Sequence, residues 1–438
     1  MGASKIQVGK IQIGMIGLGT VGSGVVQLLE KNRDLIRRRL GADIQIKKIA
    51  VAQTQKKRSL KIASSLLTDK VEEVLNDPEI SMVVELMGGI DPAKRYLLQA
   101  IEKGKHIVTA NKAVLAHHGA ELFSAAEKKK VGLGFEASVC GGIPILRALR
   151  EGLVADQVTS LYGIVNGTSN YILTEMTSEG SSFEEVLKKA QEKGYAEADP
   201  RFDVNGIDSV HKLVLLLRLA FGVQVDVESI YTEGIGRVGP LDVKFAEELG
   251  YRIKLLAIAK LEGDSMEARV HPTMLPKETL LATVDGVFNA VYLLGEYSGP
   301  GLYFGSGAGG MPTATAVVSD VVDIAKNILS GIGVRGSERM VPSKKIKPIE
   351  EVQCSHYLRF MAVDQPGVLA KIAGFLGEEG IGIASVIQKG RKLQQSVPVV
   401  IMTYEAKGRA VERALAKVDQ LPVVTEKSLA IRIETDLG

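Results

Sequence analysis

The stretch Gly17-Leu-Gly19-Thr-Val-Gly22 constrains the fold of this 438-residue chain more than any other feature. It follows the apolar run IQIGMI at 11–16 and precedes the helix pattern SGVVQLLEKNRDLI. A strand, then G-x-G-x-x-G, then a helix is the arrangement in which the three glycines allow a tight turn, close approach of a pyrophosphate and close helix packing. The helix N-terminus then faces the phosphates. We therefore predict dinucleotide binding at Gly17, Gly19, Thr20, Val21 and Gly22.

The end of the second strand bears on the choice of coenzyme. An acidic residue there would favour NAD, because it bonds the ribose hydroxyl that is phosphorylated in NADP. Here the strand ends near Val51 with Gln53 following, and the cations Lys56, Lys57 and Arg58 come next. This pattern favours NADP, with NAD as the alternative coenzyme. A solvated basic loop is the alternative interpretation of the three cations.

Composition bounds the remaining classes. The length predicts two or three domains, and a net charge of +3 without a long basic array argues against nucleic acid as a partner. The two cysteines, Cys140 and Cys354, lack metal-ligand or disulfide spacing, which fits a reducing cytoplasm. The longest apolar run, near Leu213–Val223, is too short to span a bilayer, so no membrane partner is expected.

The order of patterns along the chain predicts an α/β protein of several domains. Residues 1–135 read as the Rossmann-type dinucleotide-binding domain, and a helix near 310–333 returns to it, so that Gly307 in the preceding glycine-rich stretch reaches the cofactor. Residues 136–309 read as an α+β domain and 334–351 as a polar linker. The tail, 352–438, has the order βαββαβ and is expected to form a self-contained ferredoxin-like unit.

The segment Gly194–Lys212 combines acids and glycines directly before the apolar helix LVLLLRLAF. If 204–220 is helical, Asp208 and Lys212 share one face, four residues apart. One interpretation is a surface ion pair. The other is a site in which Lys212 donates a proton and Asp208 is its partner or binds a substrate ammonium. An ordinary lysine pKa is about 10.4, and burial lowers it toward neutrality, as a general acid requires.

A second lysine follows a short strand. Thr109-Ala-Asn-Lys112 comes after the strand HIV, whose carboxyl end should meet the ligand crevice of an open α/β sheet. Lys112 could hydrogen-bond a substrate oxygen or the cofactor there, and the alternative is a surface lysine at a helix start. We interpret His117, His118 and His211 as exposed helix residues, and their spacing does not indicate a transition metal.

Several of these stretches together carry a resemblance to a known family. Ala190 with the Gly194–Lys212 segment, GLGTVG, TANKAVLA, EASVCGGIP and NGTSNYIL resemble homoserine dehydrogenases in content and order over about 10–335. The tail resembles an ACT domain through D-Q-P-G-V-L at Asp364–Leu369. The resemblance implies NAD(P)H-dependent, reversible reduction of L-aspartate 4-semialdehyde to L-homoserine in threonine, methionine and isoleucine biosynthesis. It also implies that the α+β domain is catalytic and dimerises, giving a homodimer or homotetramer.

The resemblance further implies roles for single residues. Glu197 would hold the substrate amino group, with Asp203 and Asp208 in the same site, while Lys212 is the favoured proton donor and Lys112 also lies at the reacting oxygen. A sodium ion would be held chiefly by main-chain carbonyls of the stretch that includes Glu136, Val139, Gly141 and Ile143. The ACT domain implies an amino-acid effector near Asp364–Leu369, for which threonine is the natural candidate, or serves only as a dimer contact.

Two other functions remain open at this point. A dehydrogenase for another amino acid or oxo acid would share the fold, although the long Glu197–Lys212 signature argues against it. A nucleotide-sensing regulator would also pair a Rossmann domain with an amino-acid-binding tail, because function depends on the site rather than the fold. In such a regulator Asp208 and Lys212 would be dispensable.

Overall fold

The computed structural model describes residues 9–58, 60–331, 344–388, 395–435 and 437. Two compact units make up the chain, and each is described by itself. The first draws its described residues from 1–157, 211–227 and 303–343, and the second from 158–210, 228–302 and 344–438. Of the expected linker, residues 334–343 lie outside the described residues.

The first unit is built on a six-stranded sheet in which every strand pair is parallel. Its strands, in spatial order, are β3 (Leu67–Thr68), β2 (Ala42–Ala50), β1 (Gly9–Ile16), β4 (Met82–Glu85), β5 (His106–Thr109) and β6 (Leu133–Gly134). β4 is buried along its whole length, as expected for a parallel strand covered by helices on both faces. The predicted Rossmann-type sheet is confirmed.

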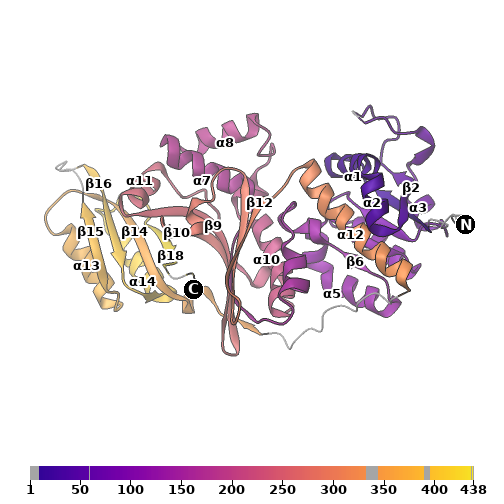
Figure 1. Ribbon diagram of the computed structural model, residues 1–438. Coiled ribbons are helices and arrows are strands. Elements are labelled where there is room, and N and C mark those ends of the chain that lie inside the picture. Colours follow the sequence, from indigo (N-terminus) through magenta and orange to yellow (C-terminus); the bar gives the residue numbers. More distant parts are fainter. Residues whose placement is uncertain (1–8, 59, 332–343, 389–394, 436, 438) are drawn as a thin grey trace, which may run out of the picture. The chain divides into compact units, whose positions relative to one another are not determined.

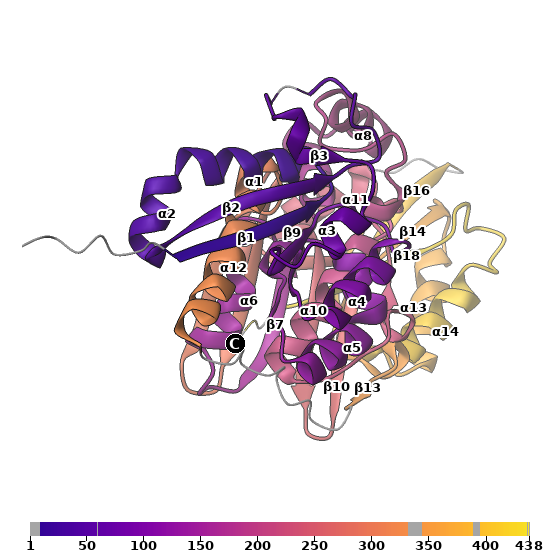
Figure 2. The ribbon, with the colours of Figure 1, turned by 90° about the vertical axis from the view of Figure 1, so that its right-hand side faces the viewer.

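Helices from distant parts of the chain cover this sheet (Figure 2). They are α1 (Thr20–Lys31), α2 (Arg33–Leu40), α3 (Glu72–Leu75), α4 (Ala93–Glu102), α5 (Lys112–Lys129) and α12 (Gly310–Ser330). α12 packs with α1 in one apolar cluster that includes Val25, Val317 and Ile13 of β1. The approach is so close that a Cβ on Gly24 would lie 2.7 Å from the carbonyl oxygen of Gly310. The expected return of a late helix is thus observed.

The second unit is organised by one long, mostly antiparallel sheet with the strand order β12-β11-β7-β9-β10-β18-β14-β16-β15 (Figure 1). Its bounds are β7 (Val158–Ile164), β9 (Tyr251–Glu262), β10 (Ser265–Pro276), β11 (Phe288–Gly295), β12 (Gly299–Ser306), β14 (Gln353–Val363), β15 (Ile383–Gln388), β16 (Ser396–Thr403) and β18 (Leu429–Ile433). The short strands β8 (Tyr231–Thr232), β13 (Lys345–Ile346) and β17 (Ala406–Lys407) pair beside this path. The helices are α7 (Gly167–Glu179), α8 (Phe183–Glu192), α9 (Arg201–Val204), α11 (Pro240–Glu248), α13 (Val368–Glu378) and α14 (Gly408–Val418).

The C-terminal part of this unit has the predicted βαββαβ order. β14, α13, β15, β16, α14 and β18 follow one another, and the two helices pack on the sheet through a core that includes Phe360, Ile372 and Val411. The plan is confirmed, but the segment is not the self-contained unit that the sequence led us to expect. Its last strand, β18, pairs in parallel with β10, so the two sheets are one.

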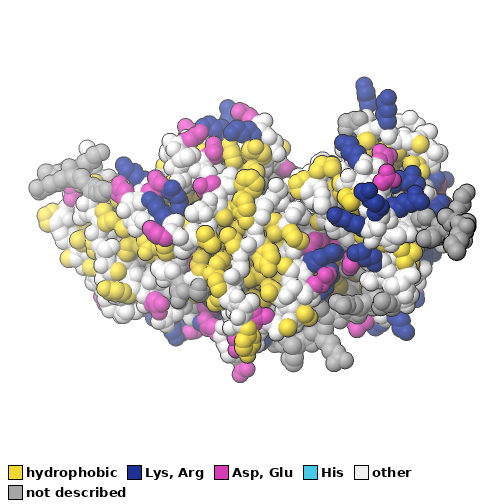
Figure 3. Space-filling view, in the orientation of Figure 1, with side chains coloured by type: hydrophobic (Ala, Val, Ile, Leu, Met, Phe, Trp, Pro, Cys, Tyr) yellow, Lys and Arg dark blue, Asp and Glu magenta, His cyan; other side chains and the backbone are white. Residues whose placement is uncertain are grey.

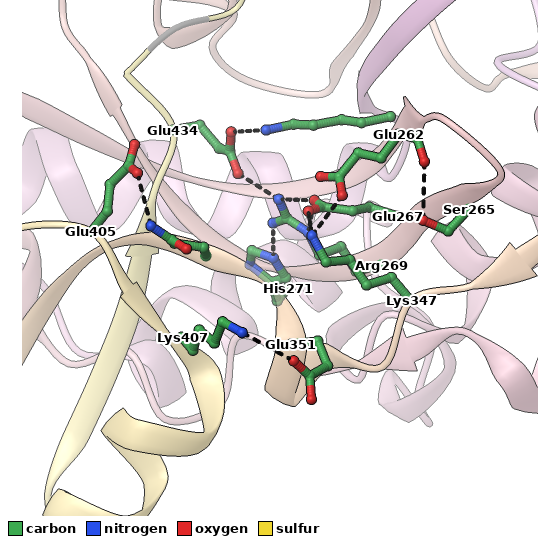
Figure 4. A network of polar contacts seen from close by, with 12 residues as sticks. Glu262, Ser265, Glu267, Arg269, His271, Lys347, Glu351, Glu405, Lys407 and Glu434 are labelled. Carbon is green, nitrogen blue, oxygen red and sulfur yellow. Dashed lines mark hydrogen bonds and ion pairs between the residues drawn. The ribbon is translucent and has the colours of Figure 1, made fainter. Parts of the chain in front are cut away.

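Buried charges hold that junction together (Figure 4). Arg269 on β10 is 1% exposed, and its guanidinium lies 2.8 Å from a Glu267 oxygen and 2.6 Å from an oxygen of Glu434, just after β18. Arg269 also contacts His271 Nε2 at 2.7 Å. Because a guanidinium can only donate, His271 is neutral there with its proton on Nδ1, which contacts the Pro272 carbonyl oxygen at 2.9 Å. Burial, with Arg269 nearby, lowers the pKa of His271 in agreement with this tautomer.

Membrane-spanning helices are not found in the part of the chain that the structure describes, since no helix there is both long and apolar enough.

We predict that His356 on β14 makes the protein acid-sensitive. Burial, and secondarily Arg432, lowers the pKa of His356 to about 3, and within the described residues its Nδ1 has no hydrogen-bond partner. The unfolded chain binds this proton near pH 6.5, so stability present above that pH is lost as the pH falls toward 3. His356→Leu should reduce the stability lost between pH 7 and pH 5 by about 1–2 kcal/mol.

Denaturant unfolding of both proteins at several pH values measures this difference. Equal acid sensitivity of wild type and His356→Leu would contradict the prediction.

Candidate functional site

The glycine turn after β1 has the geometry that the sequence predicts. Gly17 has a φ of +101°, and a Cβ there would lie 2.6 Å from the carbonyl oxygen of Leu86, so a side chain is excluded. A Cβ on Gly22 would lie 2.7 Å from the Gly17 carbonyl oxygen, which explains the third glycine as a packing requirement. Gly19 is different, because a Cβ there would meet nothing within 4 Å. Its missing side chain leaves space in front of the N-terminus of α1, where Thr20 and Val21 are the first residues.

A second glycine-rich segment lies beside this turn. A Cβ on Gly310, the first residue of α12, would come within 3.1 Å of Thr20 Cγ2. Gly307 is buried, and its carbonyl oxygen would lie 2.7 Å from a Cβ on Gly141. The structure therefore brings residues from three distant segments together around the N-terminus of α1.

A buried carboxylate that the sequence reasoning missed organises the ends of β4 and β5. Glu85 is fully buried and accepts a hydrogen bond of 2.6 Å from Thr109 Oγ1 and one of 2.8 Å from the backbone N–H of Met87. Thr109 Oγ1 in turn accepts from the Asn111 N–H, and the Asn111 side chain donates to the Gly89 carbonyl and caps α5. Burial raises the pKa of Glu85. Lys112, the first residue of α5, is thus held in place by a hydrogen-bonded loop. In the sequence, an acidic residue such as Glu85 at the end of an apolar strand is the signal that could have revealed this group.

The three cations of the loop after β2 differ in their contacts. Arg58 donates to the backbone carbonyls of Gln53, Thr54 and Lys56 at 2.8, 3.2 and 3.0 Å, so its guanidinium shapes the loop itself. Lys56 and Lys57 have exposed side chains. The two lysines therefore remain as the cations available to a phosphate group.

The acidic segment that precedes the apolar helix is broken into two helices. α9 ends at Val204 and α10 (Ile207–Phe221) begins three residues later, so the predicted continuous helix from 204 is corrected. The cause is Gly206, whose φ is +84°. Asp203 therefore belongs to α9, whereas Asp208 and Lys212 lie one turn apart on α10, and both are buried. A buried pair is not the surface ion pair that was the alternative interpretation.

Asn166 joins the two acids and was also missed from sequence. Its side-chain Nδ2 donates to Asp203 Oδ1 and to Asp208 Oδ2, at 2.8 Å each. Its Oδ1 accepts from the Ser169 N–H at 2.7 Å and so caps α7. One amide thus fixes both carboxylates against the start of a helix. The stretch NGTSNYIL contained the signal, because an Asn before a helix is a preferred cap.

The other acids of the segment are exposed. Glu197 lies on the surface of its unit, and Asp199 forms an ion pair of 2.6 Å with Arg201, whose hydrogen bonds lower the pKa of Asp199 to about 2. Asp199 therefore pairs with its neighbour Arg201 and does not belong to the group of Asp203 and Asp208. Glu197 is accessible to a ligand.

The histidine interpretation is only partly right. His117 is exposed, but His211 is buried on α10, with its ring edge-on to that of His117 at 5.0 Å between centroids. The prediction of an exposed His211 is wrong because α10 buries nearly all of its side chains, polar ones included. No group of three or more His, Cys, Asp or Glu side chains placed to hold a metal occurs among the residues described.

The stretch 136–143 has an unusual backbone conformation. Cys140 and Gly141 are consecutive residues with positive φ values, +53° and +43°. The Glu136 carboxylate is used internally, since it accepts from the N–H groups of Leu146 and Arg147 at 2.9 and 2.8 Å. Burial, and then the nearby Asp320, raise the pKa of Glu136 to about 7. Any cation here would therefore be bound by main-chain carbonyls rather than by this side chain.

These features define a class of protein. A parallel sheet with a glycine turn at a helix N-terminus, and a separate buried Asp/Lys pair on α10, describe an enzyme that uses a dinucleotide cofactor.

Comparison with known proteins gives the family. Residues 17–136 match the NAD-binding domain of homoserine dehydrogenase, 144–322 match the homoserine dehydrogenase domain, and 356–423 match the ACT domain. The chain belongs to the homoserine dehydrogenase family. It is an oxidoreductase that uses a nicotinamide cofactor, as the sequence predicts.

Full-length relatives support this assignment. Homoserine dehydrogenase of Neisseria gonorrhoeae is 45% identical over 93% of this chain and 95% of its own length. That of Bacillus subtilis is 41% identical over 94% and 95%. A crystal structure of the enzyme from Thiobacillus denitrificans has a TM-score of 0.92 at 45% identity and covers 98% of this chain and 99% of its own.

We predict that Gly17 and Gly19 fail differently when replaced. Gly19→Ala should leave the melting temperature unchanged, because its Cβ meets nothing, but weaken NADPH binding about tenfold or more if a pyrophosphate lies there. Gly17→Ala should destabilise the protein, because its backbone oxygen neighbour cannot move away. Thermal unfolding and NADPH fluorescence titration measure the two effects. Unchanged NADPH affinity in Gly19→Ala would place the pyrophosphate elsewhere.

Proposed function

We propose that this enzyme reduces L-aspartate 4-semialdehyde to L-homoserine with NADPH, and that the buried group on α9 and α10 is its substrate site. The observation that carries the proposal is the arrangement of Asp208 and Lys212 one turn apart and buried, with Asn166 bonding Asp208 to Asp203. A substrate with an ammonium at one end and an aldehyde at the other needs both charges. The carboxylates match the ammonium and the lysine matches the oxygen.

The chemistry divides between cofactor and protein. The nicotinamide, when bound, supplies the hydride that adds to the aldehyde carbon. Asp203, Asp208 and the exposed Glu197 bind the ammonium group of the substrate. Negative charge develops on the carbonyl oxygen, and Lys212 stabilises it and gives it a proton, so that the aldehyde becomes a primary alcohol. Lys112 at the start of α5 provides a second cation for the same oxygen.

The cofactor is held by the first unit. Gly17, Gly19, Thr20, Val21 and Gly22 would bind the pyrophosphate at the N-terminus of α1, since the space in front of Gly19 fits a close approach. Gly307 and Thr109 would also contact the cofactor. Gly307 precedes α12, whose first residue lies next to Thr20, and Thr109 is the last residue of β5. Lys56 and Lys57 would bind the ribose phosphate that distinguishes NADP from NAD, and both side chains are exposed for that role.

A sodium ion is part of the proposal. The backbone carbonyls of Glu136, Val139, Gly141 and Ile143 are hard oxygen donors, which suit a hard monovalent cation. The positive φ values at Cys140 and Gly141 turn the chain sharply at this place. The ion would rigidify the turn that lies against Gly307.

We propose association into a homodimer or homotetramer because β11 and β12, the two strands at one end of the long sheet, carry exposed apolar side chains. Phe288 on β11 and Tyr297 after it are 41% and 83% exposed. Figure 3 shows apolar side chains gathered along the strand that Figure 1 labels β12, next to β11 in the sheet. Such an apolar area on a sheet face is typical of a contact between copies. We also propose a cytoplasmic location, where the buried thiols of Cys140 and Cys354 stay reduced.

Lys212→Met tests the proposed catalytic role. Without the proton donor, turnover of L-aspartate 4-semialdehyde should fall about 10²–10⁴-fold, while NADPH affinity stays within twofold of the wild type, about the error of such titrations. NADPH oxidation followed by absorbance measures this, and parallel assays with NADH give the coenzyme preference. Lys188→Met, which changes an exposed lysine on α8, is the matched control and should retain full activity. Retained turnover in Lys212→Met would sink the assignment and favour Lys112 as donor.

A pocket in the ACT domain supports the proposal of an amino-acid effector. A cavity of about 290 Å³ is lined by residues of the turn and of the neighbouring strands, among them Asp364, Gln365, Gly367, Leu369, Gln388 and Val397. Gly367 has a φ of +88°, which allows the turn to begin α13 directly. The lining combines a carboxylate and amides with apolar groups, as a small amino acid such as L-threonine requires.

L-Threonine should raise the melting temperature and inhibit the enzyme, since a ligand that binds the folded state stabilises it. Asp364→Asn should abolish both effects and leave uninhibited turnover unchanged. Thermal shift and inhibition assays with L-threonine, L-methionine and L-isoleucine test this. No response to any amino acid would support the alternative that the ACT domain is a dimer contact.

A further inference from the structure

One edge of β10 is shared by three short strands from different parts of the chain. β9 pairs with β10 from Ser265 to Pro276 and occupies its other edge entirely. On the shared edge β13 pairs at 265–266, β8 at 269–270 and β18 at 273–274. β8 belongs to the catalytic part, and β18 is the last strand of the ACT domain. The two are therefore successive neighbours along one edge of the same strand.

A side chain of β18 reaches across to β8. The Arg432 guanidinium carbon lies 4.9 Å from the centre of the Tyr231 ring, and Arg432 Nη1 lies 3.7 Å from Glu233 Oε2. The Tyr231 hydroxyl donates to Glu233 Oε2 at 3.0 Å. Arg432 is 9% exposed, so its stacking on the ring and its attraction to the carboxylate are poorly screened by water.

The segment that Arg432 contacts is bonded to the substrate loop. The Glu233 N–H donates to the Val270 carbonyl, and the Ile235 N–H donates to the Val204 carbonyl at 2.8 and 2.9 Å. A Cβ on Gly234, between them, would lie 2.3 Å from the Val204 carbonyl oxygen, so backbone meets backbone without side chains between. A movement of residues 233–235 is therefore transmitted directly to the end of α9.

The loop between α9 and α10 is packed on the same strands. A Cβ on Gly206 would lie 3.1 Å from Thr232 Cγ2 and 3.2 Å from Val270 Cγ1. Asp203 comes just before this loop and Asp208 just after it, and Asn166 bonds both. The spacing of the two carboxylates thus depends on where residues 231–235 lie.

We infer that Arg432 is a positioning residue for substrate binding: from the ACT domain, through Tyr231 and Glu233, it fixes the loop that carries Asp203 and Asp208. This inference rests on the proposed function, since it takes these two acids as the ammonium site. It gives the ACT domain a direct route to substrate affinity. The ammonium lies away from the reacting carbon and is bound equally before and during the reaction, so the effect falls on KM rather than on kcat.

The test uses the full-length enzyme with L-homoserine and NADP⁺ and two conservative variants. Arg432→Lys keeps the charge but loses the planar stacking, and Tyr231→Phe removes only the hydroxyl that bonds Glu233. KM for L-homoserine should rise roughly 5–10-fold in Arg432→Lys and about threefold in Tyr231→Phe, with kcat and KM for NADP⁺ within about twofold. The double variant should be no worse than Arg432→Lys, because both changes break one chain of contacts.

Lys260→Met is the matched control. Lys260 forms an ion pair of 2.6 Å with Glu434, one residue beyond β18, but belongs to β9 and takes no part in the contacts of 231–235. It should lower the melting temperature and leave KM for L-homoserine unchanged. An unchanged KM in Arg432→Lys, an equal rise in Lys260→Met, or an equal rise in both KM values would overturn the inference. A wild type that does not oxidise L-homoserine would instead overturn the proposed function.

Discussion

The long sheet depends on the buried ion pairs that the guanidinium of Arg269 forms. This guanidinium lies between Glu267 on its own strand and Glu434 beyond β18, with a neutral His271 beside it. An ion pair in such a place costs desolvation, and removing one partner of a buried pair typically costs about 3–5 kcal/mol because a charge is left unpaired. Because the charge of Arg269 must be paired, it fixes which strand lies next to β10 and in which register. An apolar contact would allow several registers.

At that junction the catalytic domain and the ACT domain share one sheet. β18 and β8 occupy the same edge of β10, and the loop between α9 and α10 packs on that edge through Gly206. The proposed substrate site needs its two carboxylates at a fixed separation. A single amide, Asn166, bonds both of them, and the backbone contacts of 233–235 hold the loop between them. The chemistry itself needs little more than cationic groups and a nicotinamide, so much of the structure serves to place a few charges.

The sequence predicts those parts of the fold that local patterns determine. The turn at Gly17–Gly22 is marked by the G-x-G-x-x-G pattern between a strand and a helix, and the βαββαβ order of the tail follows from alternating periodicities. The buried status of Asp208 and Lys212 was one of two alternatives, since four-residue spacing is the same on a surface and in a core. The break at Gly206 went unpredicted because one glycine within a helical pattern is often tolerated. His211 was misjudged and Asn166 was missed because their neighbours come from distant parts of the chain. The pairing of β10 with β18 joins residues that are far apart in sequence, and no local pattern records it.

The central claim is that this site reduces an amino-acid aldehyde with a nicotinamide coenzyme. The most direct measurement is the oxidation of NADPH by the purified, folded protein on addition of L-aspartate 4-semialdehyde, with L-homoserine identified as product. Rapid oxidation, with one L-homoserine formed for each NADPH consumed, is the predicted result. Absence of oxidation with NADPH and with NADH, in protein that binds NADPH, would contradict the account and favour a nucleotide-sensing regulator.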